Sequence, residues 1–246
     1  MKRIFFTTVS LGVLGLMSPA LAADLPTYSK APVVAAPVYD WTGFYVGVFG
    51  GGGYGDHNVV NAAGLAGFAN YSYTYDGSGY VAGGDIGYNV QSGSYLVGVE
   101  ATGFWSGIKG NDASQQLGVI DATSLREVGT LVARGGLTVD RLLLFFTGGW
   151  AYGNILHTST NGAAVDQFAV SRNGLTAGGG IAYAVTNNVI AKFEYRYFDL
   201  GAYTRAGVGL AGLTPNGLGP YTVNSTYSVV TLGIDFKFGG PVVAKY

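Results

Sequence analysis

The segment 191–197 is the part of the sequence that most restricts the fold. Apolar and charged residues alternate strictly along it: Ala191, Lys192, Phe193, Glu194, Tyr195, Arg196 and Tyr197. Successive side chains of a β-strand point to opposite faces, so one face of this segment is aromatic and the other is ionic. Charged residues make up only 11% of the chain, against about 25% in soluble domains. The pattern favours a strand whose aromatic face meets lipid and whose charges are enclosed.

The first 22 residues have the pattern of a secretory signal peptide. Lys2 and Arg3 precede a mostly apolar run over residues 4–17, and Ala20 and Ala22 supply the small residues of a signal-peptidase site. The apolar run is shorter than the roughly 20 residues that a spanning helix needs, which argues against a membrane anchor. We therefore predict cleavage of residues 1–22 and a mature chain that begins at Ala23.

A proline-containing stretch separates this signal from the rest of the chain. Pro26, Pro32 and Pro37 interrupt residues 23–40, with Ala and Val between them, which is typical of an extended tether. From residue 41 to residue 238 the character of the sequence does not change, which indicates one domain rather than two. The predicted organisation is a signal peptide at 1–22, a Pro/Ala-rich periplasmic tether at 23–40 and a single domain at 41–246.

Composition argues against several classes of protein. The signal carries two of the 13 basic residues and none of the 14 acidic ones, so its removal moves the formal net charge from −1 to −3. No basic patch for nucleic acid is visible. The chain has no cysteine, which excludes disulfides, thiolate metal sites and a lipid-modified N-terminal cysteine. After the signal, no unbroken apolar run reaches 18 residues, so a helical membrane protein is not expected.

Eight segments share a pattern of aromatic or β-branched residues that alternate with small or polar ones. They are residues 41–53, 79–91, 94–107, 125–139, 142–153, 173–186, 188–200 and 226–238. The connections between them alternate in length. Long ones cover 54–78, 108–124, 154–172 and 201–225, and tight ones lie near 92–93, 140–141 and 187. An up-and-down barrel with all its long loops at one end requires this alternation.

The abundance of glycine fits a narrow barrel. The chain has 42 glycines, and runs such as 50–53 and 178–180 lie inside strand-like segments. The lumen of an eight-stranded barrel is just wide enough for side chains to fill it, so small residues relieve crowding there. A phosphate-binding turn would need a strand followed by a helix, and no glycine run leads into a helical pattern. A nucleotide site is therefore not expected.

A soluble barrel is the rival architecture, with the aromatic face inside. Its wetted face would then carry residues such as Gly178, Gly180 and Ala182, which would leave the surface bare and uncharged. If these small residues instead face the lumen, they leave room for charged side chains. The charges that we predict to line the barrel interior, with a structural role, are Glu100, Arg134, Lys192, Glu194, Arg196, Asp235 and Lys237.

The opposite face then forms an apolar band that includes Trp and Tyr for interfacial girdles. Its predicted members are Val97, Val99, Trp105, Leu131, Phe146, Trp150, Tyr152, Ile181, Tyr183, Phe193, Tyr195, Tyr197, Leu232, Ile234 and Phe236. In lipid, only a closed barrel lets strands bond all of their backbone groups internally. We therefore predict an all-β fold, an eight-stranded antiparallel up-and-down transmembrane β-barrel.

Several stretches of the chain, in this order after a signal peptide, resemble a known family: 22–26, 41–47, 147–153, 191–201 and 233–238. They are similar to the eight-stranded outer-membrane β-barrel proteins of alphaproteobacteria, which are often labelled porin-family or opacity-type surface antigens. The resemblance implies the bacterial cell outer membrane, with its lipid and its assembly machinery as partners. It also implies a C-terminal aromatic residue as the assembly signal. Phe238 and Tyr246 are both candidates, because residues 239–245 lie between them.

Candidate catalytic and metal-binding residues are few. The only histidines, His57 and His157, fall in predicted long connections and lack metal-site spacing, so we expect them to be solvated. Haem or metal capture by the two histidines is the alternative. Ser159 and Asp166 share a connection with His157, but proximity in sequence is not triad geometry. We expect no enzyme, and no catalytic, cofactor or metal site.

The interior charges have two interpretations. They could line a narrow ion channel, or they could pair across the barrel, for example Arg134 or Arg196 with Glu100 or Glu194. Pairing is favoured because side chains largely fill an eight-stranded lumen and because an unpaired buried charge is strongly unfavourable.

The predicted function is that of a surface protein with a structural role in the cell envelope and four loops outside the cell. Two alternatives stay open: a ligand-capturing or adhesive receptor for haem or a host surface, and a narrow pore for small solutes. Tyr71, Tyr73 and Tyr75 would suit contacts with sugars or proteins, yet their alternation equally suits a strand extension above the membrane. Peptidoglycan or a host surface is a further candidate partner. We expect no nucleic-acid partner.

Overall fold

The structure, a computed structural model, describes residues 38–61, 72–112, 119–161, 164–205 and 221–239. These residues belong to the compact unit Val38–Tyr246, which is distinct from the unit Met1–Pro37. The predicted signal peptide and most of the predicted tether therefore lie outside the described residues. So does Tyr246, one of the two candidate assembly signals.

All regular secondary structure of the described residues is β-strand. The strands are β1 (Gly43–Asn61), β2 (Ser72–Ser92), β3 (Tyr95–Ser106), β4 (Lys109–Asp112), β5 (Val119–Val139), β6 (Leu142–Asn161), β7 (Ala164–Ala184), β8 (Val189–Arg205) and β9 (Tyr221–Lys237). In this part of the chain, no helix has the length and apolar character that membrane crossing requires.

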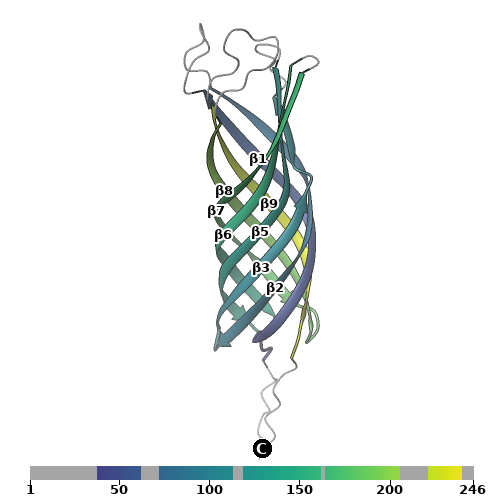
Figure 1. Cartoon of the computed structure of the whole chain (residues 1–246). Helices are drawn as coiled ribbons and strands as arrows, with labels where there is room; N and C mark the ends of the chain where they lie inside the picture. Colours follow the sequence, from purple (N-terminus) through teal and green to yellow (C-terminus); the bar gives the residue numbers. More distant parts are fainter. Residues whose placement is uncertain (1–37, 62–71, 113–118, 162–163, 206–220, 240–246) are drawn as a thin grey trace, which may run out of the picture. The chain divides into compact units, whose positions relative to one another are not determined.

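The strands form one antiparallel sheet that closes on itself (Figure 1). β1 pairs with β2 on one side and with β9 on the other, so the first and last strands meet. β3 and β4 occupy a single position in the wall, since both pair with β2 and with β5. The wall therefore has eight positions, and the predicted eight-stranded antiparallel barrel is confirmed.

The strands are longer than the sequence pattern predicts. β2, β5 and β7 each contain 21 residues, whereas about 10 tilted residues are enough to cross a bilayer. The connection predicted over 154–172 is almost entirely strand, because β6 extends to Asn161 and β7 begins at Ala164. Regular pairing of β6 with β7 over this whole length explains the difference, since the ladder continues beyond the apolar band.

Three short turns connect the strands at one end of the barrel, as predicted. They follow β2, β5 and β7 and include Gly93, Asp140 and Asn187. Gly93 and Asp140 have positive φ values of 60° and 49°. Tight hairpin turns need this left-handed backbone, which glycine adopts freely and aspartate tolerates.

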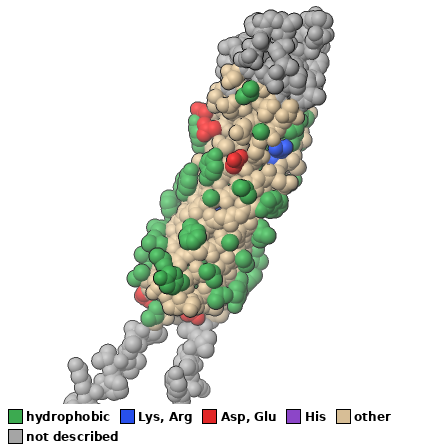
Figure 2. All heavy atoms as spheres, turned by 90° about the vertical axis from the view of Figure 1, so that its left-hand side faces the viewer, with side chains coloured by type: hydrophobic (Ala, Val, Ile, Leu, Met, Phe, Trp, Pro, Cys, Tyr) green, Lys and Arg blue, Asp and Glu red, His purple; other side chains and the backbone are tan. Residues whose placement is uncertain are grey.

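The outer face of the wall carries the apolar side chains. β3 presents four exposed apolar side chains on this face: Tyr95, Val97, Val99 and Trp105. Ten residue steps at a tilt of about 45° span roughly 25 Å, the height of the lipid-facing band of outer-membrane barrels. On the face that Figure 2 shows, hydrophobic side chains are spread along the wall and charged ones are few. Among the predicted lipid-facing residues, only Tyr152 is half-buried, and its hydroxyl contacts the Ser171 hydroxyl at 2.9 Å.

Side chains in successive layers fill the interior. The inward face of β3 shows the order, because Leu96 is followed by Glu100 and then by Phe104. The layer nearest the short turns is apolar and contains Tyr39, Trp41, Leu96, Leu143, Phe145, Ala182, Ala184 and Ile190. An ionic layer and a second apolar layer follow. Beyond them lie Val59, Tyr75 and Val223.

Candidate functional site

The ionic layer contains most of the charged residues that the sequence analysis singled out. All seven are buried in the structure: Glu100, Arg134, Lys192, Glu194, Arg196, Asp235 and Lys237. The alternation of each strand places them inward, because their sequence neighbours Val99, Ala133 and Phe193 point outward. Six of them, all except Lys237, form one cluster across the lumen.

Glu100 on β3 is the centre of this cluster. Its Oε2 atom lies 3.2 Å from Arg134 Nη1 and 3.6 Å from Lys192 Nζ, and its Oε1 atom lies 2.8 Å from Arg196 Nη2. The Tyr45 hydroxyl donates to Glu100 Oε2 at 2.8 Å and accepts from Arg134 Nη1 at 2.9 Å. One carboxylate therefore meets three cations from two different strands, so that β3, β5, β8 and β1 are tied together inside the barrel.

Two further carboxylates complete the network around Lys192. Its Nζ atom donates to Asp85 Oδ2 at 2.6 Å and lies 3.3 Å from Asp235 Oδ1. Glu194 Oε1 accepts from Arg196 Nη2 at 2.6 Å. Buried charges in such an environment are tolerated only when they are paired and hydrogen-bonded. Each of the three cations has at least one ion pair and one hydrogen bond, whereas the Nε atom of Arg134 has no hydrogen-bond partner in the part of the chain that the structure describes.

Asp85 is a member of this network that the sequence analysis missed. It lies on β2, where the neighbouring inward positions are Gly83, Gly87 and Asn89. The signal that could have found it is the alternation with the exposed, apolar Ile86 and Tyr88. A single aspartate among glycines does not show the repeated charge that marks β8.

Lys237 lies apart from the cluster, at the short-turn end. Its ammonium group donates to the Asp40 carbonyl oxygen and lies 4.6 Å from the centre of the Tyr39 ring. Trp41 is buried beside Tyr39, and its indole Nε1 donates to the Asp140 carbonyl at 3.0 Å. The residues that enter β1 thus fill the mouth of the barrel at this end.

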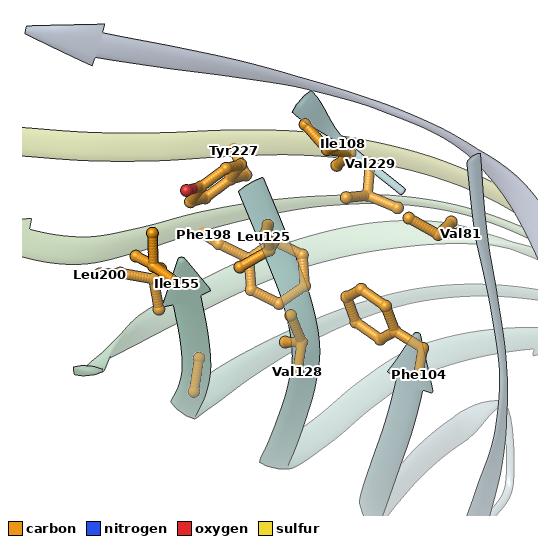
Figure 3. Close-up of a cluster of buried hydrophobic side chains, with 11 residues drawn as sticks. Val81, Phe104, Ile108, Leu125, Val128, Ile155, Phe198, Leu200, Tyr227 and Val229 are labelled. Atoms are coloured by element: carbon orange, nitrogen blue, oxygen red, sulfur yellow. The ribbon is translucent and has the colours of Figure 1, made fainter. Parts of the chain in front are cut away.

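A second apolar layer closes the lumen on the other side of the ionic cluster. Figure 3 shows its side chains gathered from several strands and pointing toward one another. The layer consists of Val81, Phe104, Ile108, Leu125, Val128, Ala151, Ile155, Phe198, Leu200, Tyr227 and Val229. The rings of Phe104 and Phe198 meet edge to face, 5.9 Å apart. These aromatic and branched side chains form an apolar layer between the ionic cluster and the end of the barrel opposite the short turns.

A small cavity of about 20 Å³ lies between the ionic and the apolar layers. Asp85, Thr102 and Arg196 line its polar side, and Phe104 and Phe198 line its apolar side. A cavity of this size holds about one water molecule. Between these two layers, the side chains of the described residues therefore pack closely.

The two histidines are buried, which corrects the prediction that they are solvated in loops. His57 lies on β1 and His157 on β6, with 1% and 8% of their surfaces exposed. His57 Nδ1 is 2.9 Å from Ser225 Oγ, and His157 Nδ1 is 2.9 Å from Thr123 Oγ1. The error followed from the strand ends, because both histidines occupy inward positions of strands that extend past the apolar band.

Two of the three tyrosines in the first predicted long connection also lie on a strand. Tyr73 and Tyr75 lie on β2, which confirms the strand extension, and Tyr71 lies outside the described residues. Tyr75 is buried against His57, with ring centres 4.9 Å apart, and its hydroxyl contacts the Thr123 hydroxyl. Tyr75 is thus part of the barrel interior.

Chemistry at the two histidines can be judged from this geometry. Burial lowers the pKa of His57 to about 4, and the nearby His157 contributes to the shift. Ser159 and Asp166 face each other in the β6–β7 register, and His157 is opposite Phe168. In the residues that the structure describes, no group of three or more potential ligands could hold a metal ion.

Comparison with known proteins gives relatives of the same kind. The chain is 30% identical over 236 residues to the 31 kDa outer-membrane immunogenic protein of Brucella melitensis, covering 89% of this chain and 93% of that protein. It is 32% identical over 171 residues to the 22 kDa outer membrane protein of Rhizobium leguminosarum, covering 69% and 68% of the two chains. No protein-family model matches the sequence.

Solved structures support the fold. The outer membrane protein OprG of Pseudomonas aeruginosa has a TM-score of 0.54 at 13% identity, covering 82% of this chain and 99% of OprG. This likeness concerns the barrel architecture alone. The 30% identity with the Brucella protein extends over nearly the full length of both chains. The chain therefore belongs to the family of outer-membrane proteins that includes this Brucella immunogenic protein, and it is a surface β-barrel of the bacterial outer membrane.

Proposed function

We propose that the protein is a closed, non-conducting barrel that stabilises the outer membrane and presents its long connections outside the cell. The observation that carries this proposal is the filled lumen, in which two apolar layers enclose an ionic one. Hydrated solutes would have to displace buried aromatic side chains and separate several ion pairs at once. A structural role in the envelope needs no such movement.

The names of the relatives support surface display. The Brucella proteins of 31 kDa and 25 kDa are both called immunogenic outer-membrane proteins. Antibodies bind an outer-membrane protein on intact cells only at parts that are accessible from outside. The parts of this chain that we propose to be presented are residues 62–71, 113–118, 162–163 and 206–220, which lie outside the described residues.

We further propose that the chain is not an enzyme and that its partners are the outer-membrane lipid and the assembly machinery. Phe238 is the candidate assembly signal for which there is structural support, since it follows β9 directly. Its ring packs against Phe44 and Phe236, with centres 5.7 Å and 5.1 Å apart. Peptidoglycan or a host surface stays a proposed further partner.

Planar-bilayer recording tests the closed barrel. The purified mature protein, refolded and inserted, should give no steady openings of the size that general-diffusion porins give. Such a porin, added afterwards to the same bilayer, shows that openings would have been detected. Steady openings from the wild-type monomer would contradict the proposal and would favour diffusion of small solutes as the function.

A further inference from the structure

A hollow of about 610 Å³ opens on the wall of the barrel at the break between β3 and β4. Its lining comes from neighbouring strands between β2 and β7. Its polar and aromatic lining includes Tyr80, Lys109, Ser124, Arg126 and Gln167. The lumen charges do not contribute to it, so this site is separate from the ionic cluster.

Two irregularities of the wall form the hollow. The β5–β6 register shifts between Leu125 and Glu127, and this bulge leaves Arg126 exposed on the outer face. Bulges commonly re-aim a side chain in this way. At the strand break, a Cβ atom on Gly107 would lie 2.4 Å from Tyr80 Cε1, so only glycine lets the tyrosine ring cover this point.

The two cations of the hollow lie on adjacent strands. Lys109 pairs with Ser124 in the β4–β5 register, and Arg126 follows two residues later on β5. Within the described part of the chain, neither cation has an ion-pair partner, whereas all three cations of the lumen cluster are paired. Glu127 is exposed beside Arg126, but no ion pair joins the two. The hollow therefore offers two cations without an ion-pair partner among the described residues, next to hydroxyl and amide groups.

The position of the hollow along the strands shows where it lies in the membrane. Along β3, the exposed apolar side chains extend from Tyr95 to Trp105, and Lys109 is the next charged residue. β5 runs in the opposite direction, toward the short turns. Its exposed Leu137 and Leu131 therefore lie nearer to the short turns, and Arg126 lies farther from them. Trp105 and Tyr80, which are 67% and 69% exposed, are residues of the kind that mark a membrane interface. In outer-membrane barrels the short turns are periplasmic, so the hollow opens at the headgroup level of the outer leaflet.

We propose that this hollow binds a phosphate group on the headgroup of an outer-leaflet glycolipid. Arg126 would give a planar, two-pronged contact to phosphate oxygens, and Lys109 would supply a second positive charge. The Ser124 hydroxyl and the Gln167 amide are the neutral donors. The acyl chains of the same lipid would lie along the apolar band below, next to Trp105. A lipid is favoured over a soluble anion because the site faces the headgroup layer directly above that band.

Lipid titration followed by native mass spectrometry tests the proposal. The mature protein is refolded in a neutral detergent, and diphosphoryl lipid A is the probe. Wild type should bind one lipid, and the double variant Lys109→Gln/Arg126→Gln should bind it about tenfold more weakly or worse, since two charge-assisted contacts are lost. The lipid affinity of each single variant should lie between those of wild type and the double variant. Lipid A without phosphates should bind wild type as weakly as diphosphoryl lipid A binds the double variant.

Controls separate this site from general charge effects. Arg141→Gln removes one positive charge at the short-turn end and should leave lipid binding within about twofold of wild type, because the site is at the other end of the membrane. Circular dichroism checks that each variant is folded. Equal affinity of wild type and double variant would overturn the proposal. Displacement of the lipid by millimolar inorganic phosphate would assign the site to free phosphate instead, and displacement by heparin would assign it to a soluble polyanion.

Discussion

Arg196 on β8 donates a 2.8 Å hydrogen bond from Nη2 to Oε1 of Glu100 on β3, across the lumen of the barrel. β3 and β8 are not neighbours in the wall, so this contact crosses the interior. Backbone pairing in the wall connects only adjacent strands. Side-chain contacts such as this one connect strands across the lumen, so the ionic cluster is part of the core.

Replacing Glu100 with Gln should strongly destabilise the barrel. The change leaves Arg134, Lys192 and Arg196 buried around a neutral group, and removing one partner from a buried ionic group costs about 3–5 kcal/mol. Glu194→Gln should have a smaller effect, since Glu194 is in ion-pair contact with Arg196 alone. Urea unfolding in lipid vesicles measures both. Glu127→Gln, on the outer face, is the matched control and should change the free energy of unfolding little. If Glu100→Gln behaved like this control, the cluster would not stabilise the fold.

Tyr195→Arg should destabilise the barrel by roughly 2–4 kcal/mol, the penalty for a lipid-facing cation near the midplane. Tyr195 is exposed on the outer face of β8, six positions after Val189, where the strand begins. Tyr195→Leu keeps an apolar residue there and removes the contact with the Ser228 hydroxyl, so it corrects for that loss. Folding in vesicles of defined thickness is the measurement. Equal stability of the Arg and Leu variants would show that this face does not meet lipid.

Gly47→Ala should lower stability by roughly 1–3 kcal/mol, the usual range for overpacking. A Cβ atom at this position would lie 2.2 Å from Asp235 Oδ1 and 2.6 Å from Asp85 Oδ1, so both carboxylates of the Lys192 site would have to move. Gly103→Ala is the control, because a Cβ atom there meets nothing within 4 Å. The pair isolates crowding from the general effect of a glycine-to-alanine change. A larger loss in Gly103→Ala than in Gly47→Ala would reject crowding as the cause.

The predicted alternation was enough to assign most side chains to a face. Phe193 and Tyr195 point outward and Lys192 and Glu194 inward because the period of a strand is two, whatever the tertiary structure. The apolar band could be predicted for the same reason, with Tyr152 as the partial exception. A local pattern carries this information because each residue's face depends only on its position in its own strand.

The ends of the strands could not be predicted in this way. His57 and His157 lie in segments rich in Asn, Ser and Thr, which resemble connections in a single sequence. They are buried because β1, β2, β5, β6 and β9 continue to pair beyond the membrane, and that pairing depends on distant segments. The closure of one mouth by Tyr39 and Trp41 is a tertiary contact of the same kind. No pattern within residues 38–42 indicates it.

The absence of cysteine in the natural chain allows a direct test of orientation. Thr74→Cys places a thiol on the exposed face of β2, away from the short turns, and Ser94→Cys places one in the turn between β2 and β3. A membrane-impermeant maleimide should label Thr74→Cys in intact cells and Ser94→Cys only after the outer membrane is broken. Short periplasmic turns are the reason for this expectation. The reverse result would mean that the barrel is inserted in the opposite direction.

Acidification should lower the stability of the barrel, because His57 is buried at the end opposite the short turns. Its imidazole is enclosed by Tyr75 from β2 and by Ser225 and Tyr227 from β9, and it lies near His157 on β6. Burial lowers its pKa, the nearby His157 adds to the shift and Asp76 opposes it, so that the pKa falls from 6.5 to about 4. The unfolded state therefore binds the proton more readily. The contribution to stability is complete above about pH 6.5 and is lost as the pH falls toward 4, by roughly 3 kcal/mol in all.

His57→Asn isolates this effect, because asparagine retains a group that can bond to Ser225 but does not titrate. The free energy of unfolding of both proteins is measured in vesicles at pH 7 and at pH 4.5. All other titratable groups are the same in the two proteins, so the informative quantity is the difference between the two pH dependences. Wild type should lose more stability than His57→Asn over this interval. Equal losses would show that the proton on His57 is accommodated in the folded barrel, and that its burial does not make this end sensitive to acid.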